Sequence, residues 1–337
     1  MLNIGIAGLG RMGQRHAEQL ALRTRGVRLV AACSPVEGER AWAQRELGVP
    51  ALHDDFAALL RDPQVQAVAI VTPTTLHAEQ TIAALEAGKH VFVEKPLALD
   101  VATCERVEAV ARRHPELVAM VGFVRRFDAS YQEAKAQIDA GRVGRPFLVR
   151  SQTCDMNDPD GFFVRFAPTS GGIFMDCSVH DIDVARWMLG SPKAQRVFAS
   201  GTIVLHPGLA ACGDVDNGLA IVEFEGGAKA QFYASRTMAH GLDTATEVIG
   251  TAGSVTVGAG GHRDRVQSRD ASGVHHRVLV DFVERFSEAF GRELSAFVAA
   301  CQGQAPPPLT LSDATEATRI GVAITQSLKS GKVEVVE

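Results

Sequence analysis

The sequence predicts an α/β protein with two domains: an N-terminal doubly wound parallel sheet and a C-terminal α+β domain with a mostly antiparallel sheet. Over the first third of the 337 residues, short apolar segments alternate with helical segments. Such alternation is typical of a parallel sheet covered by helices on both faces. After residue 123, strand segments come in pairs joined by glycine turns, which indicates antiparallel hairpins. We expect the first domain over residues 1–123 and the second over residues 124–337.

Five strands and four helices are expected in the first domain. The strands are residues 2–7, 27–32, 67–72, 90–93 and 117–123. The helices are residues 11–22, 37–47, 76–87 and 101–113. Right-handed crossovers between such elements produce an open twisted sheet, which binds ligands at the carboxyl ends of its strands. Residues at those strand ends are therefore the first candidates for a binding site.

The second domain is expected to combine helices with hairpins. The expected helices are residues 128–139, 171–187 and 281–302, with a last helix that has Ser312 as its N-cap. A strand over 146–153 is followed by a polar loop over 155–172. Hairpins are expected at 220–235 and 246–258.

Composition excludes several classes of function. Hydrophobic residues make up 46% of the chain and charged residues 22%, as expected for a globular protein. The formal net charge is −5 and no long basic segment is present, which argues against a nucleic-acid partner. We expect no membrane segment and a cytoplasmic protein, because no apolar stretch could span a bilayer and the N-terminus does not resemble a cleavable signal. The six cysteines form no C-x-x-C, which predicts reduced, mostly buried thiols.

A glycine motif, GLGRMG at residues 8–13, follows the first strand directly. Alone it is weak evidence, because the chain contains 32 glycines. At a strand-to-helix junction, however, glycines permit a tight turn and a close backbone approach. The helix N-terminus there offers N–H groups and a positive dipole to a pyrophosphate. The motif therefore predicts a dinucleotide-binding Rossmann domain, with a glycine-rich turn that binds nothing as the alternative.

The end of the second strand bears on the choice of dinucleotide. A carboxylate there usually binds the 2′-hydroxyl of the adenosine ribose of NAD, but this strand ends in Ala-Cys-Ser-Pro at residues 32–35. Glu37, Glu39 and Arg40 come later. The missing acid removes one barrier to a 2′-phosphate, yet no arginine follows immediately to bind it. The residues leave NAD and NADP both open and slightly favour NAD.

Two further segments place polar residues where buried structure is expected. Lys95 follows the strand at 90–93 within Glu-Lys-Pro, and Pro96 could introduce a cis bond that directs Lys95 toward the ligand edge. The alternative is a surface lysine in a turn. In the helix expected at 171–187, Asp176 and His180 are four residues apart and share one face. The alternative there is an exposed helix edge with a weak ion pair.

The segments GLGRMG, TPTTLHAEQTIAALEAGKHVFVEKPLALD and GGIFMDCSVHDIDVARW together resemble the Gfo/Idh/MocA oxidoreductases, and among these the bacterial inositol dehydrogenases. The resemblance extends over nearly the whole chain, including GFVRRFD and HGLDTATEVIGTAG. Glu-Lys-Pro after a strand, combined with Asp-x-x-x-His in a later helix, is specific for this superfamily and much less specific for one substrate. The resemblance implies a large, open sheet in the second domain and a homodimer or homotetramer.

The resemblance also implies roles for individual residues. Lys95, Asp176 and His180 match the residues that surround the carbon losing hydride in such enzymes. The cofactor-binding residues that it implies are Gly8, Gly10, Arg11, Met12, Gly13, Ser34, Thr72, Pro73, His77, Glu94 and Lys95. Arg126 is expected to reach the substrate, a cyclic polyol such as myo- or scyllo-inositol. Inositol dehydrogenases usually have an acid at the position of Ser34, and this chain departs from that pattern.

The residue types suit the oxidation of a secondary alcohol by NAD(P). That reaction removes the O–H proton while hydride leaves carbon, and histidine, with a pKa of about 6.5, is best suited to accept a proton near neutrality. We expect His180 to be the general base, Asp176 to orient its ring or bind a neighbouring hydroxyl, and Lys95 to stabilise the developing alkoxide. Asp155 and Asn157 are candidates for binding other substrate hydroxyls, with plain turn residues as the equal alternative. No metal is expected, because hydride transfer needs none.

Two other functions stay open. A dehydrogenase of the same family could act on an aldose, a sugar lactone or a dihydrodiol, because side chains lining the second domain's sheet decide the substrate. A non-catalytic regulator could keep the fold and sense a dinucleotide without turnover. The presence of Lys95, Asp176 and His180 together argues against the regulator, which does not need all three.

Overall fold

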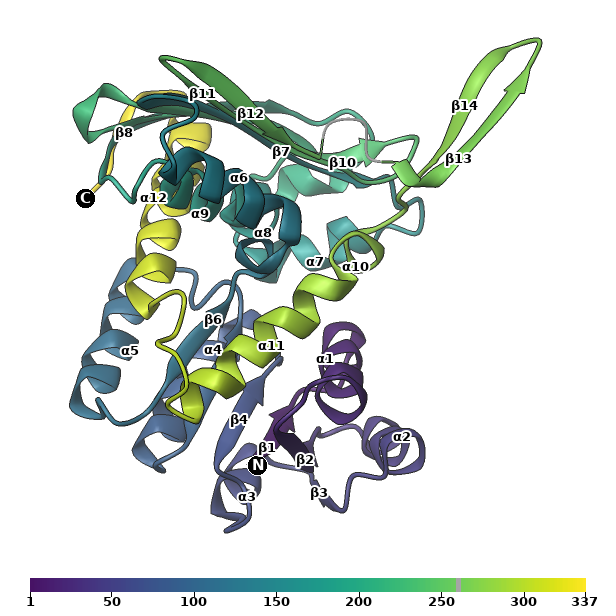
Figure 1. Ribbon diagram of the computed structural model, residues 1–337, viewed down its shortest axis with the longest axis vertical. Coiled ribbons are helices and arrows are strands. Elements are labelled where there is room, and N and C mark those ends of the chain that lie inside the picture. Colours follow the sequence, from purple (N-terminus) through teal and green to yellow (C-terminus); the bar gives the residue numbers. More distant parts are fainter. Residues whose placement is uncertain (259–261) are drawn as a thin grey trace. The chain divides into compact units, whose positions relative to one another are not determined.

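The computed structural model describes residues 1–258 and 262–337 and divides the chain into two compact units (Figure 1). Unit 1 consists of Met1–Phe127 and Glu288–Thr318, and unit 2 of Asp128–Ser287 and Arg319–Glu337. The predicted boundary at residue 123 lies close to the first observed one. The return of residues 288–318 to the first unit was not predicted, because helical periodicity does not reveal which core a helix covers.

Unit 1 is built on a parallel sheet of six strands in the order β3-β2-β1-β4-β5-β6. These strands are β1 (Leu2–Ala7), β2 (Val27–Cys33), β3 (Ala51–His53), β4 (Ala67–Ile70), β5 (His90–Glu94) and β6 (Ala119–Gly122). All four residues of β4 are buried, as expected for a strand covered on both faces. The strand order reverses between β1 and β4, and open α/β sheets bind nucleotides at that point. The predicted doubly wound sheet is confirmed.

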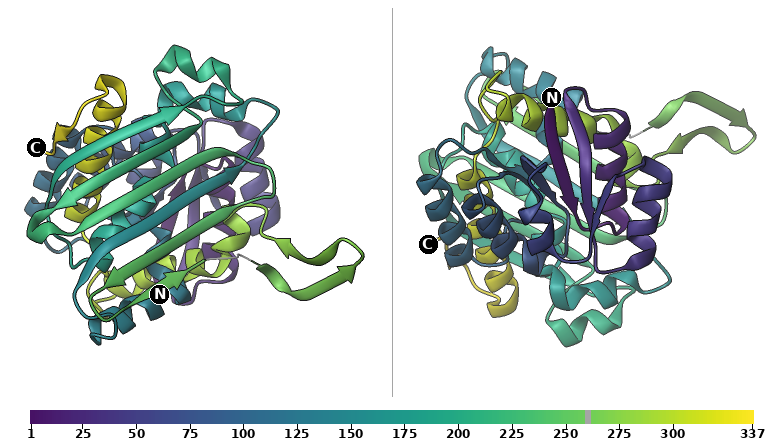
Figure 2. Two further views of the ribbon diagram at one scale, coloured as in Figure 1. Left: turned by 90° about the horizontal axis from the view of Figure 1, so that it is seen from above. Right: turned by 90° about the horizontal axis from the view of Figure 1, so that it is seen from below.

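Helices cover the parallel sheet of unit 1, which is seen from below on the right of Figure 2. They are α1 (Arg11–Leu22), α2 (Glu37–Leu47), α3 (Phe56–Arg61), α4 (Thr74–Glu86), α5 (Val101–Arg113) and α11 (Ser287–Cys301). The ring of Phe290 in α11 lies 5.4 Å from that of His16 in α1. Phe297 of the same helix lies 5.9 Å from Phe92 in β5. These aromatic contacts explain why α11 belongs to this core.

Unit 2 is built on a seven-stranded sheet in the order β12-β11-β7-β10-β9-β8-β15 (Figure 2, left). Its strands are β7 (Pro146–Met156), β8 (Ala194–Thr202), β9 (Asn217–Phe224), β10 (Lys229–Met238), β11 (Asp243–Gly250), β12 (Gly253–Val257) and β15 (Glu334–Val335). Among these described strands, β7 and β10 pair in parallel and the other neighbours pair antiparallel. The predicted mostly antiparallel sheet is confirmed.

One face of the unit 2 sheet packs against helices, and the other is open. The helices of this unit include α6 (Ala129–Asp139), α7 (Phe162–Ser170), α8 (Ile173–Asp176), α9 (Val179–Met188) and the second half of α12 (Leu311–Ser330). Figure 1 shows α6, α8 and α9 beneath the sheet. Residues of β9 alternate between buried and exposed, as expected for a sheet with one solvated face. A separate hairpin, β13 (His262–Asp270) with β14 (Gly273–Val278), extends from this unit.

Four predicted elements of the second half need correction. The helix expected at 171–187 is interrupted between α8 and α9, and the helix expected at 281–302 is divided into α10 (Phe282–Arg285) and α11. The loop expected at 155–172 contains α7, because its phenylalanines pack on one another, with Phe162 stacked on Phe166 at 5.5 Å. Ser312 is not an N-cap, since α12 already begins at Leu311.

Candidate active site

The glycine motif forms a tight turn between β1 and α1. Gly8 has a φ of +88°, and a Cβ there would lie 2.4 Å from the carbonyl oxygen of Val71. A Cβ on Gly13 would lie 2.0 Å from the carbonyl oxygen of Gly8, so both positions require glycine. A Cβ on Gly10, in contrast, would have no neighbour within 4 Å. No side chain caps α1 and no acid occupies its first turn, so its N–H groups and positive dipole suit a phosphate.

A carboxylate does lie at the end of β2, although it comes from α2. Ser34 is buried and donates its hydroxyl to Oε2 of Glu39 at 2.5 Å. Arg40 donates to the backbone oxygen of Ser34 at 2.6 Å. Sequence spacing pointed to the strand end itself and left Glu39 without a role. The signal that could have found it is the serine-to-glutamate spacing of five residues across a tight strand–helix turn.

His77 ties together the segments that follow β4 and β5. Its ring is buried, with Nδ1 2.8 Å from the backbone oxygen of Pro96 and Nε2 2.8 Å from that of Thr72. Burial lowers the pKa of His77, and the two carbonyl contacts oppose that shift without reversing it. The Lys95–Pro96 peptide bond is cis. Thr72, Pro73, His77 and Lys95 therefore lie at one edge of the sheet.

Each carboxylate oxygen of Glu94 has a hydrogen-bond partner. Its Oε1 lies 2.7 Å from Nε2 of His16, and its Oε2 accepts the backbone N–H of Lys95 at 2.9 Å. Burial raises the pKa of Glu94, but His16 and Lys95 together hold it below its usual value. In the structure the Glu94 carboxylate thus bonds to the protein itself, and its role as a cofactor-binding residue stays a prediction.

A second buried acid, Glu293 of α11, belongs to the same cluster. Its side chain is completely buried, and neither carboxylate oxygen has a hydrogen-bond partner among the described residues. Burial and the charge of Glu94 raise the pKa of Glu293 well above its usual value. The pKa values of the two acids are therefore shifted in opposite directions, that of Glu94 downward and that of Glu293 upward. Sequence reasoning missed His16 and Glu293, whose signal is a titratable residue in an otherwise apolar helix face.

Asp176 and His180 remain about one turn apart in unit 2, despite the interruption between α8 and α9. The two connecting residues, Cys177 and Ser178, both have right-handed helical backbone angles. The Asp176 Oδ2 lies 3.2 Å from Nη2 of Arg236. Arg236 was not predicted, because a lone arginine in a strand has no distinctive sequence signal.

The structure also brings Asp155 to this group. The Cys177 thiol lies 3.7 Å from Oδ2 of Asp155 and 3.8 Å from Oδ2 of Asp176. Asn157 follows two residues later, and its backbone N–H donates to the carbonyl oxygen of Met238 at 2.9 Å. Its side-chain oxygen is buried and has no partner among the described residues. The structure therefore places Asp155 close to Asp176 and joins Asn157 to the end of β10, and the contact of either residue with substrate stays a prediction.

Arg126, the other predicted substrate residue, is engaged within unit 1. Its guanidinium is buried and lies 3.2 Å from the carboxylate of Asp313 in α12. Burial raises the pKa of Asp313, whereas Arg126 and Thr310 lower it by more, so this pKa lies below its usual value. This ion pair explains the burial of Arg126 without a ligand, so a substrate contact remains only a prediction for it.

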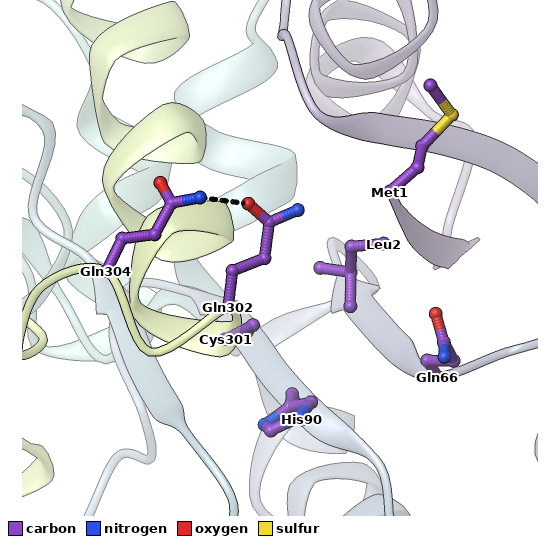
Figure 3. A pocket seen from close by; sticks show the side chains of 7 residues that line it. All are labelled: Met1, Leu2, Gln66, His90, Cys301, Gln302 and Gln304. Carbon is purple, nitrogen blue, oxygen red and sulfur yellow. Dashed lines mark hydrogen bonds between the residues drawn. The ribbon is translucent and has the colours of Figure 1, made fainter.

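A pocket of about 460 Å³ opens at the opposite, amino-terminal edge of the unit 1 sheet (Figure 3). Its lining residues are Met1, Leu2, Gln66, His90, Cys301, Gln302 and Gln304. Gln304 donates to Gln302 at 2.8 Å, and Gln302 donates to the backbone oxygen of Gly26 at 2.9 Å. These amides already bond to the protein, and the pocket lies away from the strand ends that bind nucleotides.

Across residues 1–258 and 262–337, no group of three or more His, Cys, Asp or Glu side chains could hold a metal ion. None of the helices described is long and apolar enough to cross a membrane. All six cysteines are thiols, and four of them are buried.

The glycine turn before α1, Lys95 at the carboxyl end of β5 and the Asp176–His180 spacing in unit 2 together fit a dinucleotide-dependent oxidoreductase. Residues 2–123 match the oxidoreductase family with an NAD-binding Rossmann fold, GFO_IDH_MocA, and residues 131–256 match the GFO/IDH/MocA C-terminal domain. The chain belongs to this Gfo/Idh/MocA family.

Similar proteins span the full chain. The scyllo-inositol 2-dehydrogenase (NAD(+)) of Bacillus subtilis is 39% identical over 97% of this chain and 94% of its own length. The myo-inositol 2-dehydrogenase of Thermotoga maritima is 32% identical over 99% of both chains. A crystal structure of scyllo-inositol dehydrogenase from Lactobacillus casei with bound NAD(H) and scyllo-inositol has a TM-score of 0.96 and 36% identity, over 100% of this chain and 99% of that one.

Proposed function

We propose that the protein is an NAD-dependent inositol 2-dehydrogenase that oxidises one secondary hydroxyl of scyllo- or myo-inositol to a ketone. The observation that carries the proposal is that Asp176 and His180 lie about one helical turn apart in a chain that also has Lys95 at the end of β5 and a glycine turn suited to a phosphate. The relatives with 39% and 32% identity over nearly the full chain support the choice of an inositol over an aldose.

The residues present fit a bound dinucleotide. The open space at Gly10 and the uncapped N-terminus of α1 suit its pyrophosphate. When bound, NAD accepts the hydride. We assign His180 as the base that takes the hydroxyl proton and Asp176 as the carboxylate that stabilises the resulting imidazolium. Lys95 stabilises the alkoxide, a contribution of roughly 3 kcal/mol for one such donor.

Preference for NAD over NADP is part of the proposal and rests on Glu39. Ser34 holds the Glu39 carboxylate at the end of β2, where a carboxylate usually hydrogen-bonds to the ribose hydroxyls of NAD. A 2′-phosphate there would meet a negative charge. Arg40 is already hydrogen-bonded to the backbone of Ser34. The carboxylate that the strand end lacks is thus supplied by the following helix.

We also propose that the protein forms a homodimer or homotetramer through the open face of the unit 2 sheet. Phe198 of β8 and Ile221 of β9 are directly paired and are 42% and 49% exposed. Leu219, two residues along β9, is 51% exposed. A contiguous apolar patch of this kind usually marks an interface. A cytoplasmic location completes the proposal and rests on the thiol state of all six cysteines.

Steady-state assays test the function directly. The purified protein is given scyllo-inositol, myo-inositol and several aldoses, each with NAD and with NADP, and formation of reduced dinucleotide is followed. We expect the highest kcat/KM with an inositol and NAD. Preference for an aldose would reassign the substrate. Dinucleotide binding without turnover of any polyol or sugar would identify a sensor.

A further inference from the structure

Arg236 is a fully buried arginine in a strand of unit 2. It lies in β10, its side chain is 0% exposed, and its guanidinium lies 5.3 Å from the ring centroid of Phe163. Burial of a cation in a sheet core is costly unless carboxylates compensate it. Two do so here. Nη1 donates to Oδ2 of Asp214 at 2.8 Å, and Nη2 donates to Oδ2 of Asp176 at 3.2 Å.

The same contacts fix both ends of the short helix α8. At its start, Asp214 Oδ1 accepts the backbone N–H of Ile173 at 2.9 Å, while its other oxygen holds Arg236. At its end, Asp176 is held by the other arm of that guanidinium. Asp214, Arg236 and Asp176 therefore form a clamp that spans α8. The planar fork of arginine suits this geometry, which the single ammonium of lysine cannot reproduce.

Exposure differs sharply across the clamp. The Asp176 side chain is 21% exposed, whereas those of Arg236 and Asp214 are 0% and 4% exposed. Arg236 consequently cannot touch a substrate that reaches Asp176. Any influence that Arg236 has on the chemistry must therefore pass through the carboxylates that it holds, Asp176 directly or Asp214 through α8.

We infer that Arg236 is a positioning residue for the oxidation: it holds Asp176 as an oriented carboxylate one turn before His180. The inference rests on the proposed function. Burial lowers the pKa of Arg236, whereas Cys177, Asp176 and Asp214 together raise it by more. The pKa therefore lies above its usual value, and the guanidinium stays charged. Asp176 is the carboxylate that we assign to stabilise the imidazolium formed when His180 takes the proton, so its orientation matters to the reaction.

Arg236→Lys tests the inference, because it keeps the charge and loses the fork. We expect kcat for inositol oxidation to fall about 10- to 100-fold, with dinucleotide affinity and inositol KM changed less than about threefold. The acid limb of the pH profile of kcat should also shift. Arg292→Lys is the control, since Arg292 forms an exposed pair with Glu288 at 3.0 Å on α11 in unit 1. We expect it to leave all of these values unchanged.

A double-mutant cycle separates positioning from mere stability. In an Asp176→Asn background, Arg236→Lys should cause little further loss of kcat, because its route of action is already gone. Equal losses in both backgrounds, or a lower melting temperature with wild-type kcat, would overturn the inference. If Arg236→Lys does not fold, Asp214→Asn takes its place, since it removes the carboxylate that anchors the guanidinium, and the same outcomes apply.

A titration of His180 by NMR decides the matter without turnover. His180 is assigned by the loss of its signal in His180→Gln. We expect its titration midpoint to fall in Arg236→Lys, because a misplaced Asp176 no longer favours the imidazolium, and to stay constant in Arg292→Lys. An unchanged midpoint in both variants contradicts the inference. If the His180 midpoint falls in Arg236→Lys as expected but the wild-type protein oxidises no inositol, the proposed function alone would be contradicted.

Discussion

His16 and Glu94, 78 residues apart in the sequence, form a buried hydrogen bond of 2.7 Å between Nε2 and Oε1. His16 lies on α1, whose N-terminus faces the glycine turn, and Glu94 directly precedes Lys95. The bond therefore connects the helix that follows the glycine turn to the strand end that presents Lys95. Both are parts of unit 1, so this connection is intrinsic to the dinucleotide-binding core.

Replacing His16 by Phe should weaken this core. Phe keeps the ring contacts with Phe92 and Phe290 but removes the hydrogen bond between His16 and the Glu94 carboxylate. We expect the free energy of unfolding at neutral pH to fall by about 1–3 kcal/mol in urea titrations. Because the folded-state pKa of Glu94 is lowered, its stabilising effect is lost as pH falls through that pKa.

The control for this prediction is the Glu94→Gln background, in which the charge is already absent. His16→Phe should cost less there than in the wild type. Equal costs in the two backgrounds would show that His16 acts through its ring alone.

Glu293→Gln should change the pH dependence of stability. The folded-state pKa of Glu293 is raised, so the folded protein holds a proton that the unfolded chain releases, and stability declines as pH rises above the unfolded pKa. Gln is close in shape to the neutral acid and cannot ionise. We expect the two proteins to be nearly equal in free energy of unfolding near pH 4, and the variant to be increasingly the more stable as pH rises.

Urea titrations across pH measure this difference, and Glu288→Gln is the control. Glu288 is also on α11, but its side chain is 83% exposed. It should show no such divergence. A constant gap between Glu293→Gln and wild type at every pH would mean that Glu293 is charged in the folded protein.

Lys95→Ala and His180→Ala should abolish turnover while leaving dinucleotide binding largely intact. Removal of a general base or of one electrostatic stabiliser typically costs roughly 10²–10⁴-fold in kcat. Calorimetric titration with NAD supplies the second measurement, for which we expect a Kd within about threefold of wild type. Equal loss of NAD binding and turnover in both variants would contradict the roles assigned to these residues.

Glu39→Gln should relax the preference for NAD. Loss of the charge held by Ser34 removes the repulsion of a 2′-phosphate, and we expect the NADP/NAD ratio of kcat/KM to rise about 10-fold. Binding of each dinucleotide, measured calorimetrically, should change in parallel. Glu37→Gln is the matched control, since Glu37 is exposed in the same first turn. Ser34→Asp, added to Glu39→Gln, should restore discrimination against NADP.

Much of unit 1 could be predicted because its determinants are local. Strands buried on both faces are continuous apolar segments, as in β4, and helix ends coincide with glycines or caps. The short β3 and α3 were missed, since three and six residues give little periodicity. In unit 2, Cys177 and Ser178 interrupt a helix that the apolar pattern treats as continuous.

Most residues of the proposed site could be predicted from sequence motifs, but the buried residues that hold them in place could not. Lys95, Asp176 and His180 stand out as polar residues in apolar segments. Arg236 interacts with Asp176, which is 60 residues away in the sequence. Glu293 is influenced by Glu94, which is also distant in the sequence. No local pattern reveals such pairs, because burial and charge compensation depend on tertiary packing.

Ile221→Lys should dissociate the proposed oligomer. Ile221 faces solvent in the single chain, opposite Phe198 and next to Leu219 on the open sheet face. In a two-fold interface built on this face, each copy would bring the new ammonium into an apolar contact, and neither charge would have a partner. We expect sedimentation analysis to show at least about a hundredfold weaker association. Val266→Lys is the control, because Val266 is 57% exposed on the separate hairpin β13–β14. A lower mass for Ile221→Lys alone supports association through the sheet, whereas an unchanged mass in both variants, with wild type oligomeric, places the interface elsewhere.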